Sequence, residues 1–310
     1  MNESTATHKA NEKDLGDAIG SALKANLPEA EWQWLSEQVA RIAADPQQRV
    51  VAQVFTSLPR QLKGARKDGW ISLTEPYTGP NGLPLIVERW PTVKLARVWV
   101  LMAIPKQEQT TYVQLIERLF TYGEMEELAA LYAALPVYHY PEAWASRCKE
   151  GIRSNIGPVR QAVTLQNAYP GRFLDEGGWN QLVLKAFFTE EPIGAIVGLR
   201  ERNNTRLAGA LVDYAYERHA AGRRIDPMLW LLIAPFLDER AYHLMTQMLK
   251  ESGTLSERQA ISYAFKNSGF GPAKQYVEND AALRKLSDAM ETQWEYGRKD
   301  EQGTTSYNNR

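Results

Sequence analysis

Short amphipathic stretches that end at proline or glycine follow one another along almost the whole chain. The first begins near Asp14 and ends at Pro28, which can open the next helix because a first helical turn does not need its missing amide. Its apolar face consists of Leu15, Ile19, Leu23 and Leu27. The same alternation of helical periodicity and break returns at residue 93 and continues to residue 289. The sequence therefore predicts an all-α fold.

Short helices joined by a few residues form αα-hairpins, and such hairpins can be arranged in two ways. They can stack like armadillo or HEAT repeats, or they can form an irregular helical bundle with nearly the same sequence pattern. The chain has neither a fixed repeat length nor a repeated sequence word. Both arrangements therefore remain open.

One long irregular loop, residues 64–92, interrupts the helical pattern. It is rich in glycine and proline and contains an Asn81-Gly82 turn signal. Loops of this length in compact domains are usually binding loops, lids or linkers. Residues 70–73 and 85–87 alternate enough to pair as a short hairpin within it.

The loop and the composition of the termini suggest a division of the chain into four parts. The start is small and polar, and the end is polar and lacks apolar periodicity. The expected parts are a disordered tail at 1–13, a helical region at 14–104 that contains the loop, a helical-repeat-like body at 105–290, and a flexible C-terminal tail at 291–310.

Composition and charge exclude several classes of protein. The formal net charge of −1 removes the global positive field that nucleic-acid binders carry. The longest strongly apolar run, residues 227–237, has about half the ~20 residues that a membrane-spanning helix requires. The first residues contain no apolar leader, and the single cysteine suits a reducing compartment. We therefore expect a cytoplasmic protein without a membrane span and without a nucleic-acid partner.

The common catalytic fingerprints are missing. The chain has no phosphate-binding loop, dinucleotide-binding motif, nucleophile elbow or zinc-protease motif. Its four histidines are scattered, so we expect no metal site, no cofactor and no catalytic residues. Cys148 lies between Arg147 and Lys149, whose charges could activate its thiol, although a buried, unreactive thiol is the favoured interpretation.

Charge is balanced overall but uneven along the chain. Ten basic and four acidic residues lie between 41 and 106, one basic and six acidic between 107 and 145, and five basic and one acidic between 146 and 172. One hypothesis is a basic surface for an anionic ligand or an acidic partner, since arginine binds carboxylate and phosphate bidentately. The alternative is that solvated helix faces pair with the glutamate-rich stretch. The candidates for the basic surface are Arg60, Lys63, Arg66, Arg147, Arg153 and Arg160.

Polar residues also interrupt apolar helix faces between residues 147 and 188. Asn180 shares a face with Leu184 and Phe187, so it should be buried and hydrogen-bonded. Such asparagines either line a polar pocket or act as struts between helices, and struts are favoured. The binding candidates from this segment are Asn155, Trp179, Asn180 and Lys185, and Asn167 is a further candidate for the pocket or a strut.

Three stretches of this chain form long, distinctive sequence phrases: EGIRSNIGPVRQAV, NAYPGRFLDEGGWNQLVLKAFF and LVDYAYERHAAGR. They resemble the EboA family, the metabolite-traffic proteins of the ebo operons. The resemblance is strongest between residues 118 and 236 and weaker around residues 55–64. It implies a bacterial cytosolic protein whose gene accompanies those of a prenyltransferase-like membrane protein and of hydrolase- or isomerase-like proteins. It also implies a part in exporting a secondary-metabolite precursor towards the periplasm, and it transfers no catalytic residue.

Three functions are compatible with these observations. The leading hypothesis is a non-enzymatic adaptor or carrier that binds a hydrophobic or aromatic metabolite, proteins of the same operon, or both. The second is an enzyme whose acid and base converge from distant helices, for example Glu150 or Asp213 with Lys185. The third is a scaffold without a ligand. A deep pocket with ionisable groups would favour the enzyme, and a groove or flat patch would favour docking.

Overall fold

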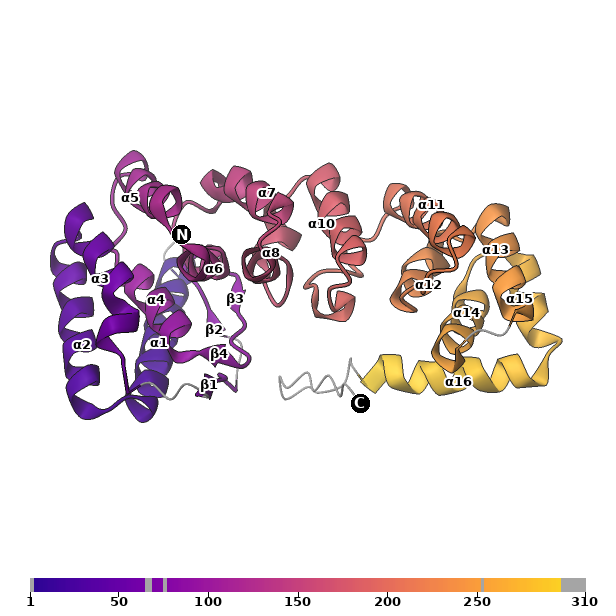
Figure 1. The fold of residues 1–310 in the computed structure, drawn as a ribbon, viewed down its shortest axis with the longest axis horizontal. Coiled ribbons are helices and arrows are strands. Elements are labelled where there is room, and N and C mark those ends of the chain that lie inside the picture. Colours follow the sequence, from indigo (N-terminus) through magenta and orange to yellow (C-terminus); the bar gives the residue numbers. More distant parts are fainter. Residues whose placement is uncertain (1–2, 65–68, 75–76, 252–253, 297–310) are drawn as a thin grey trace. The chain divides into compact units, whose positions relative to one another are not determined.

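Helices form most of the described part of the chain in the computed structural model, which describes residues 3–64, 69–74, 77–251 and 254–296 (Figure 1). The prediction of an all-α fold is confirmed, with two small two-stranded sheets as the only strands among the described residues. The chain divides into two compact units. Unit 1 comprises residues 1–179 and 195–197, and unit 2 comprises residues 180–194 and 198–310.

Unit 1 is built around α4 (Thr92–Met102), which packs against helices from both sides of it in the sequence. These are α1 (Glu3–Asn26), α2 (Glu29–Ala44), α3 (Gln48–Gln61) and α6 (Met125–Ala133). α6 also packs against α8 (Gly157–Thr164), and α8 against α7 (Ala145–Arg153). The unit is completed by α5 (Gln109–Tyr122), α9 (Tyr169–Phe173) and the 3-10 turns η1 (Leu135–Val137) and η2 (Pro141–Trp144).

Helix faces lie where apolar periodicity places them. Leu15, Ile19 and Leu23 are fully buried, because one stripe of α1 faces the core. α1 begins at Glu3 and so includes most of the segment expected to be a tail. α3 does not end before Pro59 but continues to Gln61, since a hydrogen bond from Leu62 N to Leu58 O (2.9 Å) closes the last turn around the proline.

The described residues of the long loop form a hairpin with two short sheets. β1 (Trp70–Ile71) pairs with β4 (Trp90–Pro91), and β2 (Tyr77–Thr78) pairs with β3 (Pro84–Leu85), both antiparallel. The predicted hairpin is confirmed in its first arm and at the hydrogen bond from Leu73 N to Val87 O (2.9 Å). Its second arm was misplaced, because the sheet partners of β1 lie at residues 90–91, adjoining the start of α4.

Unit 2 is built around α14 (Leu255–Asn267), which packs against α12 (Met228–Ile233), α15 (Gly271–Glu278) and α16 (Ala281–Tyr296). The other elements are α10 (Glu176–Phe188), whose first turn belongs to unit 1, with α11 (Thr205–Ala220), α13 (Glu239–Lys250), η3 (Ile193–Ala195) and η4 (Ala234–Phe236). From residue 297 the expected C-terminal tail lies outside the described residues. No described helix combines the length and the apolar character needed to cross a bilayer.

Candidate functional site at the base of the hairpin

The hairpin packs against the chain that follows α8. The backbones of Leu85 and Asn167 form an isolated antiparallel bridge. The side-chain amide of Gln166 donates a hydrogen bond to the Glu88 carboxylate. A Cβ at Gly79 would lie 2.6 Å from the main-chain oxygen of Pro136, so the hairpin approaches η1 too closely for any other residue there. The loop of residues 64–92 and the polar segment of residues 147–188 therefore meet within unit 1.

Two residues beside this contact adopt left-handed backbone conformations. Arg89 has φ 51° and Gln166 has φ 52°, although neither is glycine or asparagine. Each such residue costs about 1–3 kcal/mol and persists only where its surroundings hold it. Hydrogen bonds from Arg89 N to Ser72 Oγ (2.9 Å) and from Gln166 N to Ala195 O (2.8 Å) do so here. Because strained residues cluster at functional sites, the base of the hairpin is a candidate site.

The outer face of the hairpin carries an exposed aromatic side chain. Trp70 is 55% exposed and pairs in register with Pro91. The Arg89 guanidinium lies 5.7 Å from the centre of the Trp70 ring, within the range of a cation–π contact. Tryptophan and arginine are the residues that most often carry binding energy at protein interfaces. This face can therefore dock another molecule.

The inner face of the hairpin covers the start of α4. Ile71 pairs with Trp90, and both are buried. Lys94, one turn into α4, folds back so that its Nζ lies 4.3 Å from the centre of the Trp90 ring. Burial lowers the pKa of the Lys94 ammonium from 10.5 to about 8, and the nearby Glu126 opposes part of that shift. Lys94 is therefore a poorly solvated cation that packs against the ring of Trp90.

Arg97, one further turn along α4, is a buried arginine with few partners. It is 4% exposed, and its guanidinium lies 5.5 Å from the centre of the Phe55 ring. The Glu127 carboxylate lies 3.7 Å from Nη2, beyond hydrogen-bond distance, and Nε makes no hydrogen bond to the described residues. Burial lowers the pKa of Arg97, with partial opposition from Glu127 and two other glutamates. A buried donor without an acceptor calls for an explanation.

The first turn of α6 supplies the acid next to Arg97. Gly123 ends α5, and Glu124 then caps α6 through a capping box in which Glu124 N donates to Glu127 Oε2 (3.0 Å). The cap fixes Glu127 as a buried side chain, whereas Glu124 and Glu126 are exposed. We call Trp90, Lys94, Arg97 and Glu127 the cation site.

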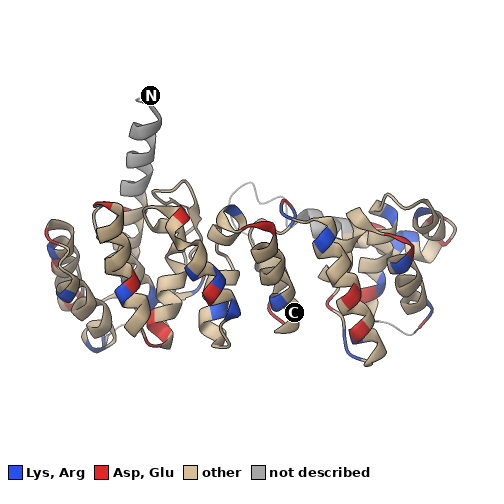
Figure 2. Cartoon of the chain, turned by 90° about the horizontal axis from the view of Figure 1, so that it is seen from above, with Lys and Arg blue, Asp and Glu red and all other residues tan. Residues whose placement is uncertain are grey.

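The basic residues predicted near the end of α3 lie at the surface. Arg60, in the last turn of α3, and Lys63, just after it, are exposed. Arg66 lies outside the described residues. Figure 2 shows basic and acidic residues spread over the helices of each unit.

Arg147 forms ion pairs with glutamates, the arrangement described by the alternative hypothesis of pairing with the glutamate-rich stretch. Its Nε lies 2.8 Å from Glu117 Oε2, Nη2 binds the same oxygen, and Nη1 lies 2.7 Å from Glu150. These contacts raise the pKa of Arg147, and its guanidinium also lies over the Phe120 ring at 5.1 Å. Of the other candidates from this stretch, Arg153 at the end of α7 is exposed, and Arg160 on α8 is half-buried with Nη1 3.5 Å from Ser154 O.

The asparagines of the polar segment act separately. Asn167 is buried and donates to the main-chain oxygens of Tyr132 and Ala162, both at 3.0 Å. Asn180 is half-buried in unit 2 and exchanges amide hydrogen bonds of 3.2 and 2.8 Å with Asn204. Asn155 is exposed. Asn167 and Asn180 are therefore struts, and the pocket hypothesis gains no support from them.

The last two predicted binding residues, Trp179 and Lys185, are buried and half-buried in different units. Trp179 is fully buried in unit 1, and Lys185 is half-buried on α10 in unit 2. The acids considered as partners of Lys185 in an enzyme are paired elsewhere, Glu150 with Arg147 in unit 1 and Asp213 with Arg240 in unit 2.

Two groups with potential for chemistry lie in unit 1 beside a cluster of aromatic side chains, Tyr112, Phe120, Tyr132, Tyr138 and Trp144. Cys148 is fully buried, and burial raises the pKa of its thiol well above the ordinary value, which favours the unreactive interpretation. His139 lies edge-on to Tyr112, and burial together with Lys106 lowers its pKa to about 4. Among the described residues, no three His, Cys, Asp or Glu side chains are grouped so as to hold a metal ion.

A family comparison connects this architecture with known proteins. Residues 16–234 match the family described as "Metabolite traffic protein EboA". The chain belongs to the EboA family. The resemblance seen in the three sequence stretches is confirmed, and the match extends it to the N-terminal helices and the hairpin. No curated protein and no solved structure matches the chain significantly.

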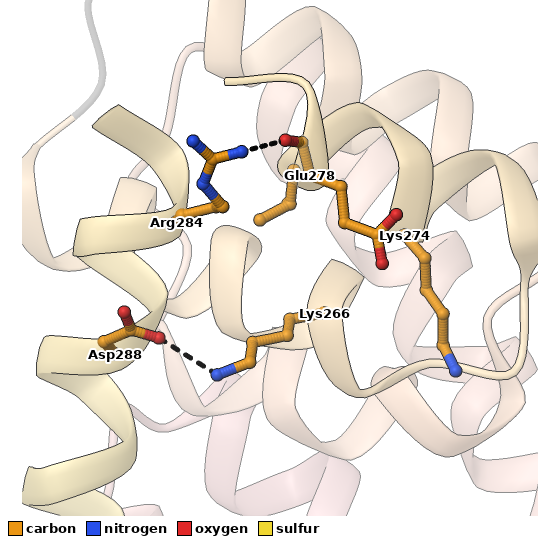
Figure 3. Close-up of a pocket in the computed structure, with 6 residues that line it drawn as sticks. Lys266, Lys274, Glu278, Arg284 and Asp288 are labelled. Atoms are coloured by element: carbon orange, nitrogen blue, oxygen red, sulfur yellow. Dashed lines mark hydrogen bonds and ion pairs between the residues drawn. The ribbon is translucent and has the colours of Figure 1, made fainter. Parts of the chain in front are cut away.

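The hairpin and the cation site of this EboA family member both lie inside the matched residues, whereas a small surface pocket of unit 2 lies beyond them. That pocket, of about 140 Å³, lies between α14, α15 and α16 (Figure 3). Arg284 donates to the main-chain oxygen of Glu278 on one side, and Lys266 pairs with Asp288 at 3.0 Å on the other. All four side chains are exposed, so the pocket is a shallow, ionic surface feature.

Sequence reasoning missed the cation site of this EboA family member. Lys94 and Arg97 entered only as part of the basic excess between residues 41 and 106. A signal was present, because Arg97 shares a helix face with Leu101 and Ile104, both of which are buried. A cation on an apolar face needs a partner, and its position there pointed to a special environment.

Proposed function

We propose that this EboA family member is a non-enzymatic carrier or adaptor for a hydrophobic or aromatic secondary-metabolite precursor. The observation that carries the proposal is the cation site, where Lys94 lies over the ring of Trp90, Arg97 lies over the ring of Phe55, and Arg97 Nε makes no hydrogen bond to the described residues. Such a place suits the polar end of a small hydrophobic molecule. The family's description as metabolite traffic proteins agrees with a molecule that is held and passed on.

The surroundings of the other reactive groups support a carrier over an enzyme. The Cys148 thiol is buried, and the acids considered for catalysis form ion pairs with arginines. If the protein were an enzyme, Lys94 would be its candidate catalytic group, because a lysine with a lowered pKa can act as a base or a nucleophile. The carrier proposal assigns it a binding role.

One experiment separates carrier, enzyme and scaffold. The gene is deleted, the metabolite fraction that accumulates in the cytosol is collected, and the purified full chain is dialysed against it. Mass spectrometry then identifies what the protein retains. A carrier retains a compound and releases it unchanged, whereas an enzyme yields a compound of different mass. Retention of nothing, with co-purification of operon proteins intact, leaves the ligand-free scaffold and rejects the carrier.

We further propose that the outer face of the hairpin docks a protein of the same operon, with a prenyltransferase-like membrane protein as the first candidate. The exposed Trp70 beside Arg89 supports this role. The place of action is the cytoplasm, and the direction of transport is towards the periplasm. Trp70→Ala should abolish co-purification of that partner, whereas Tyr122→Ala, which removes another exposed aromatic side chain, should not. Equal co-purification with both variants would reject this docking role.

A further inference from the structure

The cation site has one positive charge more than its buried groups balance. Arg97 is almost fully buried and Lys94 is half-buried, whereas Glu127 is the single acid buried with them. Charges in an apolar interior are stable only when opposite charges and hydrogen bonds compensate them. One more negative group would therefore balance the charges of the site.

The other acids nearby do not supply that group. Glu124 and Glu126 flank the site, but both side chains are exposed, so water and salt screen their effect on the buried cations. The Glu124 carboxylate also caps the first turn of α6. Glu127 is turned towards its own helix terminus, where Oε2 accepts the hydrogen bond of the capping box.

Arg97 and Lys94 are the cationic hydrogen-bond donors of the site. Arg97 and Lys94 are three residues apart on α4, a spacing that places their side chains on one helix face about 5–6 Å apart at Cβ. Arg97 Nε makes no hydrogen bond to the described residues, and Nη2 lies 3.7 Å from Glu127. Guanidinium groups bind carboxylates through two parallel hydrogen bonds, and an ammonium adds a third contact. The Trp90 and Phe55 rings beside the two cations give the surroundings an apolar character.

We propose that Lys94 and Arg97 bind the carboxylate of a small aromatic acid. This inference rests on the proposed carrier function and adds the chemical class of its ligand. The carboxylate accepts hydrogen bonds from Arg97 and Lys94, and the apolar body of the ligand lies towards the rings of Trp90 and Phe55. Because charge-assisted hydrogen bonds discriminate strongly, a neutral amide of the same shape should bind about ten- to a hundredfold more weakly.

The test uses phenylacetate and phenylacetamide, which share one shape and differ in charge. Calorimetric titration of the full chain with each compound at millimolar concentration gives the two affinities. We expect phenylacetate to bind and Lys94→Gln and Arg97→Gln each to weaken it about tenfold or more. Glu126→Gln, which removes an exposed acid outside the site, is the matched control and should leave binding equal or tighter. A spectrum of arginine side-chain N–H groups should show the Arg97 Nε–H protected from exchange when phenylacetate is bound.

Several outcomes would overturn the inference. Equal binding of phenylacetamide would reject a carboxylate site and leave the carrier function intact. Competition by inorganic phosphate at equal affinity would show a general oxyanion site instead of one for aromatic acids. Unchanged phenylacetate affinity in Lys94→Gln would reject the assignment of these residues to the carboxylate. If Arg97→Gln does not fold, the Lys94→Gln variant alone tests the assignment. Failure of phenylacetate to bind rejects the inference, whereas the carrier function fails only if the dialysis experiment also retains nothing.

Discussion

The Gln166 side-chain amide donates to the Glu88 carboxylate, a contact between residues 78 positions apart in the sequence. It joins the returning arm of the hairpin to the chain that leaves α8. Arg89 and Gln166, one on each side of this contact, both have left-handed backbones. The position of Trp90 over α4 therefore depends on a bond that compensates for local strain.

A double-mutant cycle with Glu88→Ala and Gln166→Ala measures that bond. We expect a coupling energy of about 1.5–3 kcal/mol, because the acceptor is charged and the pair is partly buried. The measurement is urea unfolding followed by circular dichroism. Glu142→Ala, an exposed acid of the same unit, is the control and should change stability by less than about 0.5 kcal/mol. Strictly additive effects of the two substitutions would contradict the prediction.

Gly151 allows α7 to approach Tyr132 closely. A Cβ at this position would lie 2.6 Å from Tyr132 Cε1, and the ring belongs to the buried aromatic cluster. Gly151→Ala should therefore destabilise the protein by about 1–3 kcal/mol, measured as a lower thermal midpoint.

The control is Gly16→Ala, also in unit 1, where the added Cβ meets no heavy atom within 4 Å apart from its chain neighbours and the backbone of its own helix α1. It should be neutral or stabilising by about 0.4–1 kcal/mol, since alanine reduces the freedom of the unfolded chain. Similar losses for both variants would mean that the contact with Tyr132 does not limit residue 151.

The helices could be predicted from the sequence, whereas the groups that surround the cation site could not. Periodicity gives the buried face of a helix, as at Leu15 and Ile19, because the pattern is local. The burial and the ion-pair partner of a charged residue depend on which distant elements pack over it. Arg147 meets Glu117 in an ion pair, whereas Arg97 is enclosed beside Glu127; the apolar face around Arg97 is visible in the local sequence, but the acid that each arginine meets is not.

The hairpin is intermediate between these extremes. Its turn signal at Asn81-Gly82 is local, and Gly82 has φ 75° as such a turn requires. The pairing of β1 with residues 90–91 could not be deduced, because a two-residue strand is too short to show an alternating pattern. Its contact with Gln166 depends on tertiary packing and has no sequence signal.

The single thiol of the chain should be unreactive in the folded protein. Cys148 is fully buried, and burial raises the pKa of its thiol despite the adjacent Lys149. Because the thiolate is the reacting species, a disulfide reagent such as DTNB should modify less than one equivalent in native protein and a full equivalent in denaturant. Reaction of native protein at the rate of a free thiol would contradict the burial of this side chain.

The stability of unit 1 should fall as His139 is forced to take up a proton. Burial and Lys106 lower its pKa from 6.5 to about 4, so the unfolded chain binds the proton more readily than the folded one. The contribution is complete above about pH 6.5 and is lost as the pH falls towards 4. The measurement is unfolding free energy against pH for wild type and His139→Gln, with the His139 titration followed by NMR. A difference between the two proteins that does not change over this range would contradict the lowered pKa.

Asn204 joins two helices of unit 2 and caps one of them. Its Oδ1 accepts from Leu207 N at 2.9 Å, which caps α11, and its amide exchanges hydrogen bonds with Asn180 on α10. Asn204→Ala should lose the cap, about 0.5–2 kcal/mol, and also leave the half-buried Asn180 amide without this partner. Asn204→Asp keeps an acceptor for the cap but loses the donor to Asn180, so it should lose less stability. The measurement is urea unfolding, with hydrogen exchange of the Leu207 amide as the local readout. Thr205→Ala, an exposed change in the next residue, is the control, and a loss in Asn204→Ala no larger than in this control would contradict both assigned roles.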